Sequence, residues 1–161
     1  SDVCSSDLSA EAAAMDAAAI AAGTPSFTLM RAAGAAATRL ICERYQMELG
    51  GGCLLLAGPG NNGGDAWVVA AELKAVGVDV TVVEVEPPRT DDARLAKARY
   101  DGRVVGLADA LAPASGTPPV VVDGLLGTGA TGAPRDAIAS AIAAIDGWRA
   151  EGARIVAMDA P

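Results

Sequence analysis

From Cys53 onward, short apolar runs alternate with longer helix-forming segments, and few folds accommodate such an alternation. The apolar runs are bounded by glycine or proline, which is typical of strands buried in a parallel sheet. Strands that alternate with helices pair in parallel, because each connection crosses a face of the sheet with the same handedness. We therefore expect an α/β fold: a three-layer αβα sandwich with a mainly parallel, doubly wound sheet, preceded by an N-terminal helix pair.

The pattern places five strands and five helices along the chain. The expected strands are Cys53–Ala57, Val78–Val83, Arg103–Val105, Pro119–Val122 and Ile155–Met158. The expected helices are Ser9–Ala22 with Ser9 as N-cap, Phe27–Leu49, Asp65–Val76 with Asp65 as N-cap, Asp91–Tyr100, and a last helix that Pro134 opens and that Gly147 and Gly152 break. A strand order of 3-2-1-4-5 would bring the carboxyl ends of the first, fourth and fifth strands together.

The composition restricts the partners and the location of the protein. With 161 residues and a hydrophobic content of 52%, the chain suits one domain with a substantial core. Its formal net charge of −8 argues against nucleic acid, whose phosphates require clustered Lys and Arg, and favours a small-molecule ligand. The sequence has neither an apolar run of membrane-spanning length nor a basic and then apolar leader. We expect a soluble, cytoplasmic protein that binds no membrane.

Both ends of the chain differ from natural domain boundaries. Residues 1–8, Ser-Asp-Val-Cys-Ser-Ser-Asp-Leu, resemble a translated sequencing adaptor, and we expect them to be non-native. At the other end the chain stops at Pro161, just after an apolar run. We therefore expect one domain over residues 9–161, incomplete at its C-terminus.

The inventory of reactive side chains excludes several kinds of site. Because the chain has no histidine, it lacks Ser-His-Asp and Cys-His catalytic arrangements and any zinc site that needs imidazole. The three cysteines, Cys4, Cys42 and Cys53, have neither the spacing of a zinc site nor the even number of a disulfide framework, so we expect buried or incidental thiols. Acid–base chemistry therefore falls mainly to carboxylates.

The loop after the first expected strand, Gly58–Asp65, reads Gly-Pro-Gly-Asn-Asn-Gly-Gly-Asp. It satisfies the G-x-G-x-x-G pattern, and Glu84 or Glu86 lies where dinucleotide-binding proteins place a ribose-binding acid, so a dehydrogenase is one interpretation. A pyrophosphate cradle, however, offers bare N–H groups at a helix N-terminus, whereas this loop places the Asp65 carboxylate there. The asparagines and Asp65 instead suit hydroxyl or amide groups, or a hard cation.

A second glycine-rich loop begins at Asp123, after the fourth expected strand. Gly127, Gly129 and Gly132 leave backbone amides accessible, no acid interrupts the loop, and Arg135 follows at the start of the helix. This loop is therefore the better phosphate cradle. The structural alternative is a flexible connection.

The polar residues of these loops also have structural explanations. Asp65 would cap its helix, and the two asparagines would occupy left-handed turns. Asp159 follows the fifth expected strand directly, where catalytic groups of α/β proteins often project, although helix capping is again the alternative. Polar groups on three neighbouring loops favour a ligand site.

In these motifs the sequence resembles the NAD(P)H-hydrate epimerase family, also called the YjeF N-terminal domain family. The resemblance covers roughly Ser9 to Pro161, and the order of its motifs at strand ends is more specific than a lone glycine fingerprint. The matching motifs are Leu29–Gly34 in the N-terminal helix pair, Gly60–Asp65, Asp123–Gly129 and Asp159–Pro161, the start of the family's Asp-x-Pro-Ser-Gly element. The resemblance implies a Rossmann-like, nucleotide-binding domain.

The resemblance implies an isomerase that interconverts the R and S forms of hydrated NADH and NADPH, which carry a hydroxyl at C6 of the reduced nicotinamide. It also implies potassium bound by Asn62 and Asp123. The reacting carbon bears both the ring nitrogen and the hydroxyl, so reversible loss of the hydroxyl or ring opening would exchange its configuration, with Asp159 as the expected catalytic acid–base. The residues implied to contact the substrate are Asn61, Asn62, Gly63, Gly64, Asp65, Gly127, Thr128, Gly129, Ala130, Thr131, Gly132, Ala133 and Asp159.

The resemblance further implies a homodimer and, in the full-length protein, a possible C-terminal ADP- or ATP-dependent dehydratase domain. Two other functions stay open. A non-catalytic ligand-binding or scaffold module of the same fold would have no need of polar groups on three loops. An NAD-dependent dehydrogenase would bind ordinary NAD tightly and would need a full substrate domain, for which the chain has no room.

Overall fold

The computed structural model describes residues 3–127, 133 and 136–158, and the side chains of these residues from 11 onward apart from residue 12. At its centre lies a five-stranded sheet in which every pairing is parallel, in the order β3-β2-β1-β4-β5. The strands are β1 (Cys53–Ala57), β2 (Val80–Glu84), β3 (Arg103–Val105), β4 (Val120–Gly124) and β5 (Arg154–Ala157). The predicted parallel sheet and its strand order are confirmed.

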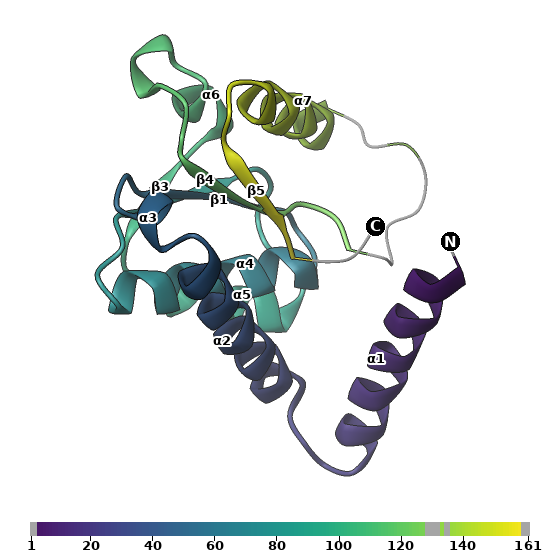
Figure 1. The fold of residues 1–161 in the computed structure, drawn as a ribbon. Coiled ribbons are helices and arrows are strands. Elements are labelled where there is room, and N and C mark those ends of the chain that lie inside the picture. Colours follow the sequence, from purple (N-terminus) through teal and green to yellow (C-terminus); the bar gives the residue numbers. More distant parts are fainter. Residues whose placement is uncertain (1–2, 128–132, 134–135, 159–161) are drawn as a thin grey trace.

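Helices cover both faces of the sheet, so the predicted αβα sandwich is confirmed (Figure 1). One face carries α2 (Ser26–Arg44), α4 (Asn61–Ala75) and α5 (Asp91–Ala98), and the other carries α6 (Leu107–Ala110) and α7 (Asp136–Ala150). The short α3 (Gln46–Leu49) leads into β1, and a 3₁₀ turn (Pro113–Ser115) precedes β4. The first helix, α1 (Val3–Ala21), extends away from the sandwich.

Successive residues of the central strands enter different cores, because side chains along a strand point alternately to the two faces. Leu55 and Val82 pack beneath α2 and α4, whereas Leu56 and Val83 pack beneath α7. All four are fully buried. Burial on both faces explains why these strands read as continuous apolar runs rather than as an alternation of apolar and polar residues.

The helix α7 buries Ile138 and Ile145 against the sheet. Of the two glycines expected to break this helix, Gly147 lies inside it, and the helix ends at Ala150, shortly before Gly152. Gly147 is exposed and would leave open space around a side chain, so it opposes the helix only by the roughly 1 kcal/mol that glycine costs relative to alanine. Burial of the neighbouring Trp148 outweighs that cost.

The N-terminal helix pair is present, but its limits differ from those expected. The first helix begins at Val3 rather than at Ser9, so Ser9 lies inside the helix and does not cap it. The single helix expected over Phe27–Leu49 is interrupted at Tyr45, whose backbone angles (φ −123°, ψ 28°) are not helical. Neither difference alters the sheet.

Close contact between α2 and α4 positions the start of α4. Met30 is buried in the core between these helices, and Gly34 faces Val68. A Cβ atom on Gly34 would lie 2.4 Å from Cγ1 of Val68, so only glycine permits this approach.

The helix after the first loop begins earlier than predicted. It was expected to run from Asp65 to Val76 with Asp65 as its cap, but α4 starts at Asn61 with Gly60 as its N-cap, so Asp65 lies inside the helix beyond its first turn. Gly63 and Gly64 disfavour a helix by roughly 1 kcal/mol each relative to alanine. Both are buried in contacts with other segments, and this packing determines the structure here instead of intrinsic propensity.

The remaining strand and helix limits agree with prediction to within two residues. The segment between β3 and β4, for which the sequence indicates little, contains α6 and the 3₁₀ turn. None of the helices in the described ranges is both long enough and apolar enough to cross a membrane.

Candidate functional site

The strand order reverses between β1 and β4, because β1 leads to β2 on one side and β4 leads to β5 on the other. In doubly wound sheets, ligands bind in the crevice beyond the carboxyl ends of the strands at such a point. The register pairs Ala57 with Gly124 and Asp123 with Ala157, so the ends of β1, β4 and β5 lie side by side. The predicted convergence of these three strand ends is confirmed.

The segments that follow β1 and β4 approach so closely that no side chain fits between them. The Gly58 amide donates a hydrogen bond of 3.0 Å to the Gly124 carbonyl. A Cβ atom on Gly58 would lie 2.0 Å from the Leu125 carbonyl oxygen, and one on Gly63 would lie 2.0 Å from the Gly58 carbonyl oxygen. These neighbours are backbone atoms, so packing alone requires glycine at both positions.

Asn62 joins the two segments through its side chain. Its Nδ2 donates a hydrogen bond of 3.0 Å to the carbonyl oxygen of Leu126, and the residue is buried. For the amide oxygen of Asn62, the structure records no partner among the described residues. Asn61, in contrast, is exposed. Asn62 therefore holds the start of the second loop through its Nδ2.

Asp123 lies within β4, which continues to Gly124, so the second loop starts slightly later than predicted. Its Oδ1 accepts a hydrogen bond of 3.0 Å from the Leu125 amide, a local turn that fixes the direction of the chain. For its other carboxylate oxygen, the structure records no hydrogen bond or ion pair among the described residues. Because Asp123 and Asn62 bond to consecutive residues, the structure brings the two predicted metal ligands to the start of the same loop.

Replacing Asn62 by aspartate is expected to lower the free energy of unfolding by about 1–3 kcal/mol, because a carboxylate would face the Leu126 carbonyl with no proton to donate. The matched control is Asn61→Asp, on the exposed side of the same helical turn. A negative charge there is favourable, by roughly 0.3–1 kcal/mol. Urea unfolding of both variants measures the difference, and equal midpoints would contradict the role of the Asn62 hydrogen bond.

The start of α4 inside the motif changes the electrostatics of the first loop. The amides of the first turn lack partners within the helix and carry a partial positive charge. No acidic residue lies in that turn, and the half-buried Asp65 comes after it and has contacts of its own. Asp65 therefore does not occupy the helix N-terminus, and the prediction that it repels phosphate there is wrong.

The acids at the end of β2 do not support a dehydrogenase. Glu84 forms an ion pair with Lys97 of α5, and Glu86 forms one of 2.7 Å with Arg89. Both residues that the dehydrogenase interpretation assigns to a ribose are thus engaged by basic side chains.

Part of the predicted site lies outside the described residues. Gly127 is half-buried and Ala133 is exposed. Met158, which precedes Asp159, donates a hydrogen bond of 2.9 Å to the Asp123 carbonyl, so β5 reaches the same edge of the sheet as β4. The predicted site residues outside the described ranges are Thr128, Gly129, Ala130, Thr131, Gly132 and Asp159, and Arg135 is outside them as well.

The thiols of the described residues are poor candidates for a reactive site. Cys53 is buried, and burial raises the pKa of its thiol to about 12, so it stays protonated near neutral pH and is a poor nucleophile. Cys42 is half-buried and unpaired. Over the ranges that the structure describes, no three His, Cys, Asp or Glu side chains are arranged to hold a metal ion.

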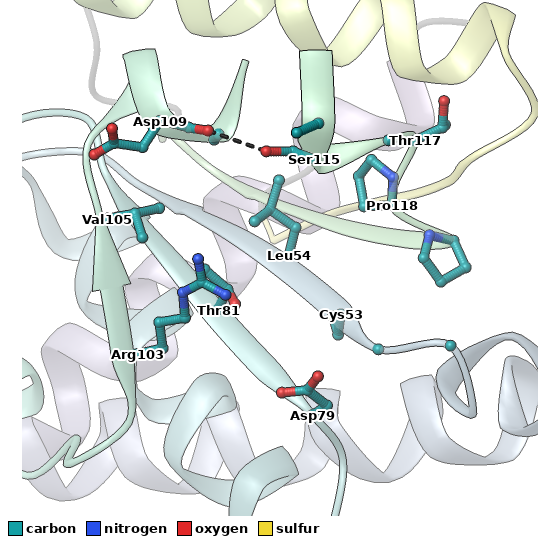
Figure 2. A pocket seen from close by; sticks show the side chains of 16 residues that line it. Cys53, Leu54, Asp79, Thr81, Arg103, Val105, Asp109, Ser115, Thr117 and Pro118 are labelled. Atoms are coloured by element: carbon teal, nitrogen blue, oxygen red, sulfur yellow. Dashed lines mark hydrogen bonds between the residues drawn. The ribbon is translucent and has the colours of Figure 1, made fainter. Parts of the chain in front are cut away.

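A feature that the sequence does not reveal lies at the opposite edge of the sheet, where the strands begin. A cavity of about 530 Å³ is formed there by residues from several separate segments, among them Leu54, Thr81 and Arg103 (Figure 2). No local motif joins these segments, so only the fold brings them together. The cavity is separate from the carboxyl ends of β1 and β4.

Proteins of other organisms are similar to this chain. An NAD(P)H-hydrate epimerase of Cenarchaeum symbiosum is 40% identical over 140 residues, which cover 83% of this chain and 62% of that protein. The bifunctional NAD(P)H-hydrate repair enzyme Nnr of Thermanaerovibrio acidaminovorans is 39% identical, over 77% of this chain and 25% of that protein. The Nnr of Escherichia coli is 37% identical, over 86% of this chain and 26% of that protein. The chain thus spans less than two thirds of each relative.

The fold also matches a solved structure. The crystal structure of the yeast protein ynu0, YNL200c, superposes with a TM-score of 0.80 at 22% identity, covering 95% of this chain and 69% of that one. The family described as YjeF-related protein N-terminus matches residues 26–161, from the first residue of α2 to the end of the chain. Because this match covers both motif loops and the whole sheet, the chain belongs to the family of YjeF-related protein N-termini.

Proposed function

We propose that this domain is an NAD(P)H-hydrate epimerase, an isomerase that interconverts the R and S forms of C6-hydrated NADH and NADPH in nicotinamide nucleotide repair. Relatives named for this activity, or for the bifunctional repair activity, are 37–40% identical to it. The structural observation that carries the proposal is the hydrogen bond from Asn62 to the Leu126 carbonyl. It joins the two motifs that the resemblance assigns to the substrate, in the crevice where α/β proteins bind ligands.

The crevice has the chemistry that an anionic dinucleotide requires. The first turn of α4 presents backbone amides with a partial positive charge, and glycines leave the backbone of both loops accessible. In our proposal the first motif, Asn61–Asp65, and the second loop, Gly127–Ala133, contact the hydrated dinucleotide. In both loops the groups that suit phosphate are backbone amides. The polar side chains of the first loop can therefore bind the ribose and nicotinamide groups.

A potassium ion is part of the proposal, with Asn62 and Asp123 as its ligands. Amide and carboxylate oxygens suit hard cations. One polar atom of each side chain is held by the start of the second loop, while the remaining oxygen has no partner among the described residues. The ion would add positive charge to the crevice of a chain whose net charge is −8.

The proposed chemistry needs one carboxyl group. The reacting carbon bears the ring nitrogen and a hydroxyl, so protonation and departure of the hydroxyl as water, followed by return of water to the other face, inverts its configuration with no net change in atoms. Ring opening and closure is the alternative route. Asp159 would donate the proton and take it back, contributing roughly 10²–10⁴-fold as positioned acid–base groups do.

The assembly and location of the protein belong to the same proposal. We expect a homodimer in the cytoplasm, where the unpaired Cys42 and Cys53 would stay reduced. In the full-length protein, an ADP- or ATP-dependent dehydratase domain would follow, since two of the relatives are named bifunctional repair enzymes and this chain spans about a quarter of each.

A chromatographic assay tests the proposal. Pure R-hydrate of NADH or of NADPH, supplied with the protein and potassium, is expected to yield S-hydrate faster than the spontaneous conversion, and replacing potassium by tetramethylammonium is expected to lower the rate. Separate assays of the two hydrates measure the cofactor preference. No acceleration by a full-length version would overturn the enzymatic proposal and favour a non-catalytic binding module.

A further inference from the structure

The cavity at the amino ends of the strands arises from a short crossover. The connection from β3 to β4 covers the sheet with only α6, of four residues, and a 3₁₀ turn of three, whereas the 15-residue α7 covers the neighbouring region. Leu54, Thr81 and Val105 are therefore only half-buried, although Leu56 and Val83 further along the same face are fully buried. The cavity of about 530 Å³ lies over this incompletely covered part of the sheet (Figure 2).

Three charged side chains border this cavity. Arg103 is the first residue of β3, Asp79 directly precedes β2, and Asp109 lies on α6. Although the cation and both carboxylates belong to one cavity, none of the three side chains has a hydrogen-bond or ion-pair partner among the residues described. Elsewhere on the surface, basic side chains such as Lys74 and Arg94 do pair with a nearby carboxylate.

These charges define the complementary ligand. One guanidinium and two carboxylates match a molecule with one carboxylate and two ammonium groups, and the side chains of Leu54 and Val105 offer an apolar surface to a methylene chain. A volume of this size is in the range of small-molecule pockets, roughly 300–1,000 Å³. We propose that this cavity binds a basic amino acid, with its carboxylate on Arg103 and its amino groups on Asp79 and Asp109.

Other ligand classes fit these charges less well. A dicarboxylate would leave both aspartates facing like charge, and a diamine would leave Arg103 without a partner. The binding site also stands apart from the proposed epimerase crevice, because β1 begins at the cavity with Cys53 and ends at the crevice with Ala57. The inference therefore does not depend on the epimerase activity.

Isothermal titration of the intact chain with L-lysine tests the proposal. Two analogues isolate the charged contacts: L-norleucine lacks the side-chain ammonium, and cadaverine lacks the carboxylate. Charge-assisted hydrogen bonds are the strong ones, so we expect lysine to bind at least about tenfold more tightly than either analogue. No measurable binding of lysine at millimolar concentration, or equal affinity for all three compounds, would overturn the proposal.

Variants locate the site. Arg103→Gln and Asp79→Asn are each expected to weaken lysine binding about tenfold, while the control Arg94→Gln, on an arginine outside the cavity, leaves the affinity unchanged. Thermal unfolding without ligand establishes that each variant is folded. Binding of lysine by both cavity variants with the original affinity would show that the ligand binds elsewhere, and the proposal would then be wrong.

Discussion

An Asp159→Asn variant is expected to convert the R-hydrate into the S-hydrate about 10²–10⁴-fold more slowly than the unchanged chain. Asparagine has nearly the size of aspartate and keeps its polarity, but its amide neither gives up nor accepts a proton near neutral pH. The loss should therefore appear mainly in kcat, with a smaller change in KM. Initial rates of S-hydrate formation at several substrate concentrations measure both quantities.

The matched control is Asp146→Asn, which removes the same charge from the exposed face of α7, where Asp146 pairs with Arg149. Its rate should equal that of the unchanged chain, because exposed ion pairs contribute little. If the unchanged chain is active and Asp159→Asn is equally fast, Asp159 has no part in proton transfer. The epimerase proposal would then need another acid, whereas an inactive unchanged chain would remove the proposal itself.

The order of the strands could be predicted because it depends on local pattern and on general rules. Apolar runs such as Cys53–Ala57 identify buried strands from the residues themselves. Each connection between successive strands contains helical segments and crosses a face of the sheet, which favours a parallel, right-handed crossover. The meeting of the carboxyl ends of β1 and β4 at the point where the strand order reverses followed from the same rules.

The start of α4 could not be predicted, because it depends on contacts between distant segments. Asn-Asn-Gly-Gly has low helix propensity, and local rules place the helix after it, with Asp65 as cap. In the structure, Gly63 packs on the Gly58 carbonyl and Asn62 bonds to Leu126, a residue 64 positions away. These contacts extend the helix into the motif. Asp65 therefore does not lie at the helix N-terminus, and the first loop is no longer excluded as a phosphate-binding loop.

The cavity at the amino ends was equally hidden from the sequence. Its charged residues, Asp79, Arg103 and Asp109, belong to separate elements and match no motif. The cavity exists because the connection between β3 and β4 covers little of the sheet. The sequence of this connection has no clear hydrophobic periodicity, so the length of its helices could not be predicted. Such a site becomes visible only when the strands are assembled.

Replacing Gly63 by alanine is expected to lower the free energy of unfolding by about 3 kcal/mol, in the upper range for overpacking a core. Alanine normally favours a helix over glycine by roughly 1 kcal/mol, so the sign of the effect is itself diagnostic. The added methyl would lie 2.0 Å from the Gly58 carbonyl oxygen, and that backbone is held in turn by the Gly124 carbonyl. Urea unfolding gives the change directly.

The neighbouring Gly60→Ala is the matched control, because a Cβ atom there meets nothing within 4 Å and its φ of −94° suits any residue. It should change the free energy of unfolding by less than about 1 kcal/mol, the scale of differences at a helix N-cap. A large difference between the two variants assigns Gly63 to the contact between the loops, independently of any ligand. If both variants unfold at the same urea concentration as the unchanged chain, that contact does not require glycine, and the glycine at position 63 would have to be explained by the substrate.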